Sequence, residues 1–157
     1  GPSGLFLVRG FIRITTDEYG CHGRMDSMLL YEGESYKVRG ACFKVYNTLG
    51  GGIREKIIER ALCNELKQEG LKVVEQVKIN IVYRGEIIGV YIPDIVIEDK
   101  IICELKSKPF ITKEDEKQFW SYLKGSRFQL GFLINFGPKK LDIKRFIYTP
   151  PIRINPQ

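Results

Sequence analysis

Apolar and polar positions recur along this chain in two rhythms, which divide it into helical and extended parts. Between residues 34 and 49, and again between residues 53 and 69, apolar side chains return every three or four positions. That spacing predicts two amphipathic helices. Three glycines at 50–52 separate the helices, and Gly70 ends the second one in the manner of a C-terminal cap.

Strand patterns follow the two helices. Three segments rich in valine and isoleucine predict strands: 72–83, 87–97 and 101–107. The polar turns 84–86 and 98–100 join these strands, so that consecutive strands run in opposite directions. We expect a three-stranded meander, with the second strand interrupted by its internal proline.

One more helix and two more strands complete the pattern. The helix is predicted at 112–124, because Thr112 and Asp115 have the spacing of a capping box. Apolar runs at 128–135 and 142–148 predict the last two strands. The order α-α-β-β-β-α-β-β predicts an α/β domain in which a central mixed sheet is flanked by helices.

The two ends of the chain differ from this core. Residues 1–24 begin with Gly-Pro-Ser-Gly, which is typical of a protease-cleavage scar, and continue as a short strand pair or a vector-derived extension. We expect a single domain at 25–149 and a proline-rich tail at 150–157.

Composition and charge are compatible with certain partners, but they do not identify a function. The chain has 157 residues, 43% hydrophobic and 28% charged, which is typical of an ordinary folded domain. Its formal net charge is +6, and residues 1–24 contribute only one of these positive charges. A basic core of this kind permits a polyanionic partner such as nucleic acid.

Several classes of site and location are excluded by the sequence. No apolar run approaches the roughly 18–20 residues of a membrane span, and no secretory signal is visible, so we expect an intracellular protein with no membrane contact. The four cysteines, Cys21, Cys42, Cys63 and Cys103, form no CxxC pair and are expected to be reduced thiols. With His22 as the single histidine, chemistry has to come from carboxylates, lysines or hydroxyls.

One carboxylate is predicted on the apolar face of the second helix. On a helical wheel Glu55 falls between Leu62 and Leu66, and Glu59 lies one turn further on at the edge of the same arc. A glutamate in apolar surroundings costs free energy unless it is paired or binds a metal. A buried pair with an arginine or lysine is the structural alternative.

A second group of polar residues lies in the meander. Period-two alternation places Glu104 and Lys106 on one face of their strand, and a three-residue turn at 98–100 would place Asp94 directly opposite Glu104. Opposed carboxylates repel unless a cation lies between them, and hard oxygen ligands suit Mg²⁺ or Mn²⁺. The alternative is a half-exposed strand with a surface ion pair.

The third helix carries two polar residues that share a face. Gln118 and Tyr122 are four positions apart on a helix that is otherwise aromatic at this point. The alternative is that the tyrosine belongs to the core and the glutamine to the surface.

Taken together, these residues resemble the PD-(D/E)XK nuclease superfamily. Three motifs carry the resemblance: Pro93-Asp94 with Glu104-Leu105-Lys106 for the signature, Gly52 to Ile58 for the GxxExxY branch, and Gln118 to Tyr122 for the QxxxY motif of RecB-type exonucleases. One position departs from the pattern, because Ile58 stands where the GxxExxY motif has tyrosine.

The resemblance implies a restriction-endonuclease-like fold and a role for each matching residue. The implied metal ligands are Asp94, Glu104, the backbone carbonyl of Leu105 and, as a further ligand, Glu55. Lys106 would position the attacking water, while Gln118 and Tyr122 would support the lysine or contact the scissile phosphate. No iron–sulfur cluster is expected, since no cysteine follows Cys103.

The resulting hypothesis is a Mg²⁺-dependent nuclease, with Mn²⁺ as a substitute, that hydrolyses single- or double-stranded DNA and leans towards end processing. The basic residues expected to neutralise the DNA backbone are Lys124, Arg127, Lys139 and Lys140, followed by Lys144 and Arg145. A homodimer would let a single-site nuclease cut both strands. The first alternative is a non-catalytic nucleic-acid-binding or assembly module with the same fold, and the second is an enzyme acting on a small substrate.

Overall fold

The computed structural model describes residues 5–8, 12–15 and 30–150. In chain order the elements are β1 (Leu5–Val8), β2 (Ile12–Thr15), α2 (Glu32–Leu49), α3 (Glu55–Gln68), β3 (Val73–Glu75), β4 (Ile79–Tyr83), β5 (Glu86–Tyr91), β6 (Ile95–Ile97), β7 (Ile101–Lys106), α4 (Lys113–Gly125), β8 (Leu130–Phe136) and β9 (Leu141–Ile147). The predicted helices, and the last three predicted strands, agree with these bounds within two residues.

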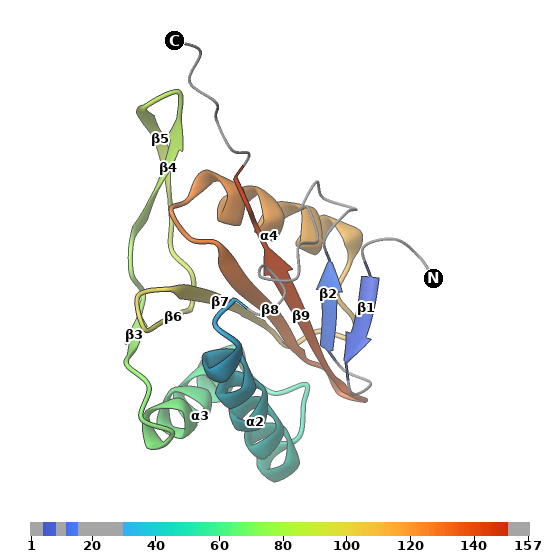
Figure 1. The fold of residues 1–157 in the computed structure, drawn as a ribbon. Coiled ribbons are helices and arrows are strands. Elements are labelled where there is room, and N and C mark those ends of the chain that lie inside the picture. The colour runs from blue at the N-terminus through green and yellow to red at the C-terminus, as the bar shows by residue number, and fades with distance from the viewer. Residues whose placement is uncertain (1–4, 9–11, 16–29, 151–157) are drawn as a thin grey trace.

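Seven of the described strands form a mixed sheet in the order β1-β2-β9-β8-β7-β6-β3 (Figure 1). β7 and β8 run parallel, as do β2 and β9, whereas the other neighbours are antiparallel. The parallel pair is joined through α4, which is the crossover that parallel neighbours require. The predicted α/β class, with a central mixed sheet flanked by helices, is confirmed.

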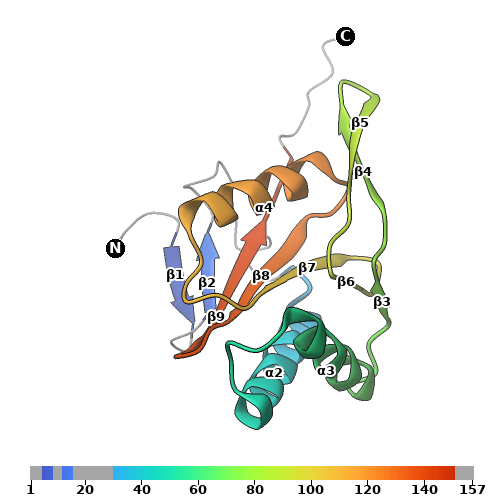
Figure 2. The ribbon, with the colours of Figure 1, turned by 180° about the vertical axis from the view of Figure 1, so that it is seen from behind.

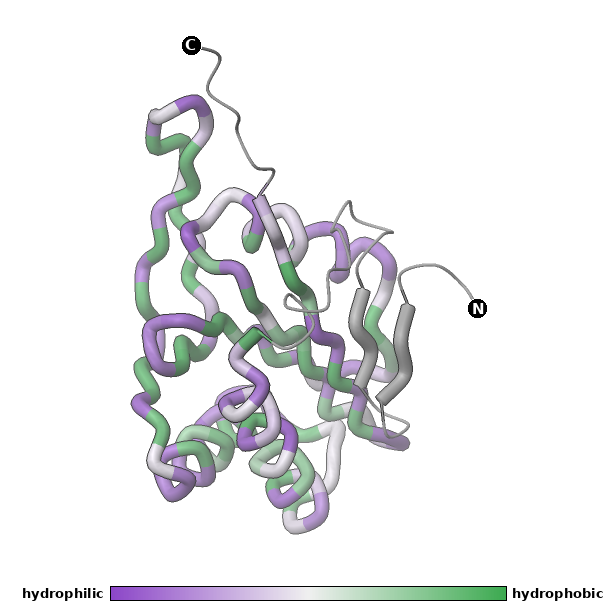
Figure 3. Tube along the Cα trace, viewed as in Figure 1, coloured by the Kyte–Doolittle hydropathy of each residue, from purple (hydrophilic) through white to green (hydrophobic). Residues whose placement is uncertain are grey.

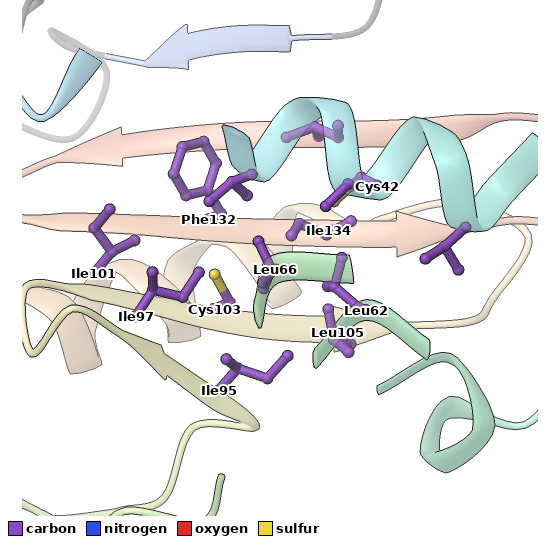
Figure 4. Close-up of a cluster of buried hydrophobic side chains, with 14 of the residues drawn as sticks. Cys42, Leu62, Leu66, Ile95, Ile97, Ile101, Cys103, Leu105, Phe132 and Ile134 are labelled. Atoms are coloured by element: carbon purple, nitrogen blue, oxygen red, sulfur yellow. The ribbon is translucent and has the colours of Figure 1, made fainter. Parts of the chain in front are cut away.

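Helices cover both faces of the sheet (Figures 1 and 2). α2 and α3 pack on one face, where Ile101, Cys103 and Leu105 of β7 enter the core (Figure 4). α4 packs on the other face over Ile102 and Leu133. β7 therefore contributes alternate side chains to two cores, and Glu104 and Lys106 belong by alternation to the α4 side.

The start of α4 is built as its sequence predicts. The Asp115 backbone N–H donates to Thr112 Oγ1 at 3.1 Å, and the Thr112 N–H donates to Asp115 Oδ2 at 3.0 Å. This reciprocal capping box satisfies donors that a helix N-terminus leaves free. Its position sets the depth at which α4 begins and hence the height of Gln118 and Tyr122 above the sheet.

Two predicted strands were wrong in their extent, because each one divides. The segment 72–83 divides into β3, in the main sheet, and β4, while 87–97 divides into β5 and β6. The breaks fall at Gln76, whose φ is 59°, and beside Pro93, which has no N–H to donate to a ladder. β4 and β5 leave the main sheet as a separate hairpin that projects from the body (Figures 1 and 2).

The projecting hairpin is closed by Arg84 and Gly85, which both have positive φ as a tight primed turn requires. Much of its apolar surface is exposed, including Ile87 and Ile88 at 64% and 63% (Figure 3). Its base is different, since Ile79 and Tyr91 pair with each other and are buried beside α4.

At the N-terminal end, the strand-pair alternative is confirmed. β1 and β2 pair antiparallel, and β2 pairs with β9, so these residues extend the main sheet. The native or cloned origin of residues 1–24, the boundary at residue 25 and the tail from 150 stay predictions. Cys21, His22 and residues 151–157 lie outside the described residues.

Three of the cysteines lie in the core under α2 and α3. Cys42, Cys63 and Cys103 are buried free thiols (Figure 4 labels Cys42 and Cys103). Burial raises the pKa of the Cys63 thiol to about 12 and raises those of the other two as well. Buried neutral thiols of this kind act as small apolar side chains.

A membrane span is not found among the helices of the described residues, since none combines the necessary length and apolar character.

Candidate active site

Asp94 and Glu104 meet at the end of the β6–β7 hairpin. Ile95 pairs with Cys103, so the same register places Asp94 opposite Glu104, as the three-residue turn predicts. The Leu105 backbone N–H donates to Asp94 Oδ2 at 2.7 Å, which ties the side chain of one strand end to the backbone of the other. Both carboxyls are half-buried.

The electrostatics of this pair favour a bound cation. Burial raises the pKa of Asp94, partly offset by the Leu105 N–H and by Lys106 and Lys56. Burial and, after it, the charge of Asp94 raise the pKa of Glu104 to about 7, although the Tyr91 hydroxyl and Lys106 act in the opposite direction. Two adjacent carboxylates that resist ionisation together are stabilised by a positive charge between them.

Lys106 lies two residues beyond Glu104 on the same face of β7 and is half-buried. It lines a small pocket of about 20 Å³ together with Glu104, Tyr91, Gln118 and Tyr122. This volume holds about one water molecule. The structure thus brings the signature lysine, one signature carboxylate and both QxxxY residues to one place.

α4 supplies the opposite wall of this pocket. Gln118 Nε2 lies 3.5 Å from the Tyr122 hydroxyl, so the two residues share a face as predicted. The ring of Tyr122 stacks on the ring of Tyr91 with centroids 4.2 Å apart and planes inclined by 8°. Tyr91 in turn donates its hydroxyl hydrogen to Glu104 Oε1 at 2.8 Å.

The prediction for α3 chose the wrong carboxylate as the buried one. Glu55 is exposed, because α3 begins at this residue and its first turn extends beyond the packed part of the helix. Glu59, one turn further on, is only 3% exposed. Glu55 still acts on the site through its charge, which raises the pKa of Glu104.

Glu59 has its own group of partners beside Asp94. Lys56 Nζ lies 3.2 Å from Glu59 Oε2. Burial raises the pKa of Glu59 to about 7, and a hydrogen bond with Glu75 and the charge of Asp94 act in the same direction. Glu75 is the partner that carries the charge, since its pKa is lowered by the hydrogen bond from Glu59.

The donor set fits a hard divalent cation. Asp94 and Glu104 each have one oxygen held by a hydrogen bond, which leaves the other oxygen of each to face a metal. Carboxylates with a backbone carbonyl such as that of Leu105 and water are the ligands that Mg²⁺ prefers. Among the described residues, however, no three His, Cys, Asp or Glu side chains are grouped closely enough to hold a metal, so Glu55 does not join this pair.

Ile58, at the position of the motif tyrosine, is fully buried among apolar side chains of α2, α3 and the sheet. The departure from the GxxExxY pattern therefore places a packing residue at this position, on the opposite face of the sheet from the Glu104 pocket.

The basic residues predicted to contact DNA fall into two groups at opposite ends of β8. Lys124 and Arg127 precede the strand, whereas Lys139 and Lys140 follow it in the turn before β9. Lys124, Lys139 and Lys140 are exposed. Arg127 Nη2 lies 2.6 Å from Asp99 Oδ1, so this exposed guanidinium is already in an ion pair.

The expectation that Lys144 and Arg145 face a DNA backbone was wrong. Both are buried, at 5% and 4% exposure. Lys144 forms an ion pair with Glu116 of α4, and Arg145 donates to the backbone carbonyl of Leu30. Their strand is buried along most of its length, so the side chains on both of its faces are covered.

Tyr91 and Lys56 are the site residues that the sequence reasoning missed. Lys56 falls on the polar side of the helical wheel, although its flexible side chain reaches Glu59. Tyr91 precedes Pro93-Asp94 by two positions, and a polar aromatic residue so close to a signature carboxylate was the available signal.

A comparison with family models identifies the PD-(D/E)XK nuclease superfamily over residues 32–146, which includes every residue of the site described above. No curated protein and no solved structure matches the chain significantly. The matched segment runs from the start of α2 almost to the end of β9. On this match, which spans well over half of its length, the chain belongs to the PD-(D/E)XK nuclease superfamily.

Proposed function

We propose that this protein is a divalent-metal-dependent deoxyribonuclease that hydrolyses phosphodiester bonds and acts by preference at strand ends. The observation that carries the proposal is the opposed, half-buried pair Asp94 and Glu104, with Lys106 on the same face of β7. Superfamily membership supports nuclease chemistry, and the QxxxY pair on α4 supports end processing. The GxxExxY branch remains our assignment for the α3 segment.

The residues of the site have separate roles in the proposed reaction. Asp94 Oδ1, Glu104 Oε2 and the Leu105 carbonyl are the atoms that would hold the metal, here Mg²⁺ or Mn²⁺. The metal, when bound, would lower the pKa of a water and polarise the phosphate. Lys106 places a positive charge beside the pocket, where it orients the attacking water and stabilises the negative charge that develops on the phosphate. As the water oxygen forms the new P–O bond, the P–O bond to the leaving sugar oxygen breaks. The proton that the water loses passes to solvent, and the leaving oxygen takes up a proton from solvent.

The basic surface residues support a DNA partner, and the cysteines of the core support a reducing compartment. Lys124 and Arg127 at one end of β8, and Lys139 and Lys140 at the other, would neutralise phosphates along roughly 20 Å of backbone. The free thiols of the core fit a reducing intracellular compartment. A homodimer would place a second site on the complementary strand, which light scattering with and without DNA would test.

Cleavage of labelled DNA tests the proposal directly. Single-stranded, double-stranded and covalently closed circular substrates are incubated with the full chain in Mg²⁺ or Mn²⁺. We expect linear substrates to be cut and the closed circle to resist. Glu104→Gln and Lys106→Ala should each lose at least about 100-fold in rate, since both groups act on the reacting atoms.

The matched control is Lys44→Ala. It removes an exposed lysine of α2 that forms an ion pair with Glu69 at the end of α3. It should cut at the wild-type rate. Binding of DNA without cleavage in either metal would favour the non-catalytic module instead. Equal cleavage by Glu104→Gln and the wild-type protein would show that the site is assigned wrongly.

A further inference from the structure

Tyr91 links α4 to the carboxylate of Glu104. It lies at the end of β5, at the base of the projecting hairpin, and is 7% exposed. Its hydroxyl donates to Glu104 Oε1 at 2.8 Å, while its ring stacks on Tyr122 at 4.2 Å. Tyr122 in turn lies within hydrogen-bond distance of Gln118. The contacts form one path from the helix to the strand.

This path constrains a side chain that the sheet alone leaves free. The backbone of Glu104 is held beside Leu133 of β8, but its carboxyl is at the end of three rotatable bonds. A phenol that donates to one oxygen selects one orientation of the carboxyl and leaves the second oxygen facing the pocket.

The stacking of Tyr91 on Tyr122 also holds the Tyr91 hydroxyl in place relative to Glu104. Tyr91 belongs to a hairpin that is separate from the main sheet, so its distance from Glu104 is not set by a shared ladder. Near-parallel stacking on Tyr122 joins Tyr91 to α4, which packs on the sheet that carries Glu104. Stacked aromatic rings attract each other beyond the effect of their buried area.

We propose that Tyr91 is a positioning residue that orients Glu104 for metal binding, and that Tyr122 and Gln118 act on the site by holding the ring of Tyr91. The proposal rests on the proposed metal-dependent function. It assigns the QxxxY pair a task that differs from contact with DNA. Outer hydrogen bonds to metal ligands typically change metal affinity by 10–100-fold.

Binding of Mn²⁺ to the full chain without DNA is the primary measurement, made by isothermal titration calorimetry. Tyr91→Phe keeps the ring and its stack but removes the donor, and should weaken Mn²⁺ binding about 10-fold. Tyr122→Leu removes the stack and should weaken it by a smaller factor, about 3-fold. Tyr122→Phe keeps the stack but removes the contact with Gln118, so it should weaken Mn²⁺ binding by at most about 2-fold, less than Tyr122→Leu.

The matched control is Tyr46→Phe. Tyr46 also donates its hydroxyl hydrogen within the fold, to the Gly137 carbonyl at 3.1 Å, but it lies on α2 away from the pocket. It loses the same kind of hydrogen bond and should keep wild-type Mn²⁺ affinity. Cleavage kinetics add a second readout, because Tyr91→Phe should lower kcat at fixed metal and leave the KM for DNA within about 2-fold.

The outcomes separate this inference from the proposed function. Mn²⁺ binding that weakens in Tyr91→Phe, in a wild-type protein that cuts no DNA, supports the positioning role and contradicts the nuclease. Unchanged Mn²⁺ affinity in Tyr91→Phe, in a wild-type protein that does cut, overturns the positioning role alone. A wild-type protein that binds no Mn²⁺ overturns both. If Tyr122→Leu raised the KM for DNA and kept wild-type metal affinity, the QxxxY pair would contact DNA instead of holding Tyr91.

Discussion

Asp94 and Glu104 lie opposite each other, next to the paired residues Ile95 of β6 and Cys103 of β7, and neither has a lysine or arginine in a salt bridge within the described residues. Their raised pKa values show that the folded protein resists two negative charges at this point. A divalent cation would remove that cost, and it would do so only in the folded state, where the two carboxyls are adjacent.

We therefore expect Mg²⁺ to stabilise the folded protein. A ligand present at about 100 times its Kd raises the free energy of unfolding by about 2.7 kcal/mol. Thermal unfolding in increasing MgCl₂ at constant ionic strength should show the rise in Tm, and Asp94→Asn should lose most of it. Asp99→Asn, which removes an exposed carboxyl at the tip of the same hairpin, should keep the full shift. An equal shift in both variants would place Mg²⁺ elsewhere.

Glu59 should make stability depend on pH. Its pKa is raised to about 7 from an ordinary value of 4.5, so between these values the folded state keeps a proton that the unfolded chain loses. The free energy of unfolding then falls as the pH rises through this window, with a slope of at most about 1.4 kcal/mol per pH unit for this group. Urea unfolding from pH 5 to pH 8 should show a shallower slope in Glu59→Gln. An unchanged slope would mean that Glu59 titrates normally.

The buried ion pair between Glu116 and Lys144 joins α4 to β9. The charged atoms are 3.0 Å apart, and the side chains are 8% and 6% exposed. Glu116→Gln leaves a buried ammonium without its charge partner and should cost about 3–5 kcal/mol. The double variant Glu116→Leu with Lys144→Met should recover much of that loss in urea unfolding.

The exposed pair formed by Lys44 and Glu69 provides the comparison for that experiment. Lys44→Gln should cost less than about 1 kcal/mol, because solvent screens the pair. If Glu116→Gln were as mild as Lys44→Gln, the buried pair would carry no special weight.

Gly51 should tolerate no side chain. A Cβ at this position would lie 1.8 Å from the carbonyl oxygen of Gly137, and that neighbour is backbone that cannot rotate away. Gly51→Ala should therefore force apart the loop before α3 and the turn after β8, at a cost above about 2 kcal/mol. Gly40→Ala, in the exposed part of α2 with open space at its Cβ, should stabilise by about 0.5–1 kcal/mol. Equal melting temperatures for the two variants would contradict this close approach.

Phosphate contacts by Lys139 and Lys140 should be visible in the salt dependence of DNA binding. Loss of one phosphate contact reduces the slope of log K against log salt by about 1. Lys139→Ala and Lys140→Ala should each show this reduction in fluorescence anisotropy titrations, and Lys44→Ala should not. Slopes equal to that of the wild-type protein would place the DNA elsewhere on the surface.

Local sequence patterns were sufficient for the helices, for the last three strands and for the most local part of the site. The capping box of α4 was readable because its two residues are three positions apart and bond to each other's backbone. The opposition of Asp94 and Glu104 was readable because a three-residue turn sets the register of the hairpin. The face shared by Gln118 and Tyr122 follows from helical geometry alone.

Errors arose where a longer-range contact decided the outcome. The pattern predicts β3 and β4 as one strand, since both are rich in valine and isoleucine, but the chain breaks at Gln76 and the two strands pair with different partners. Lys144 and Arg145 read as surface residues until α4 and the segment before α2 were placed over them. Glu55 and Glu59 lie on similar faces of the helix, and the packed length of α3 decides which of them is buried.

The sequence by itself determined the helices, the last three strands, the α/β class and the resemblance to a superfamily whose family model matches residues 32–146. These are consequences of periodicity and spacing, which act within a few residues. Only the tertiary structure decided that Tyr91 meets Glu104 and Tyr122, that Glu59 rather than Glu55 is buried, and that Lys144 pairs with Glu116. Each of these joins separate elements, and the free energy that selects such contacts comes from burial and charge pairing that no local pattern records.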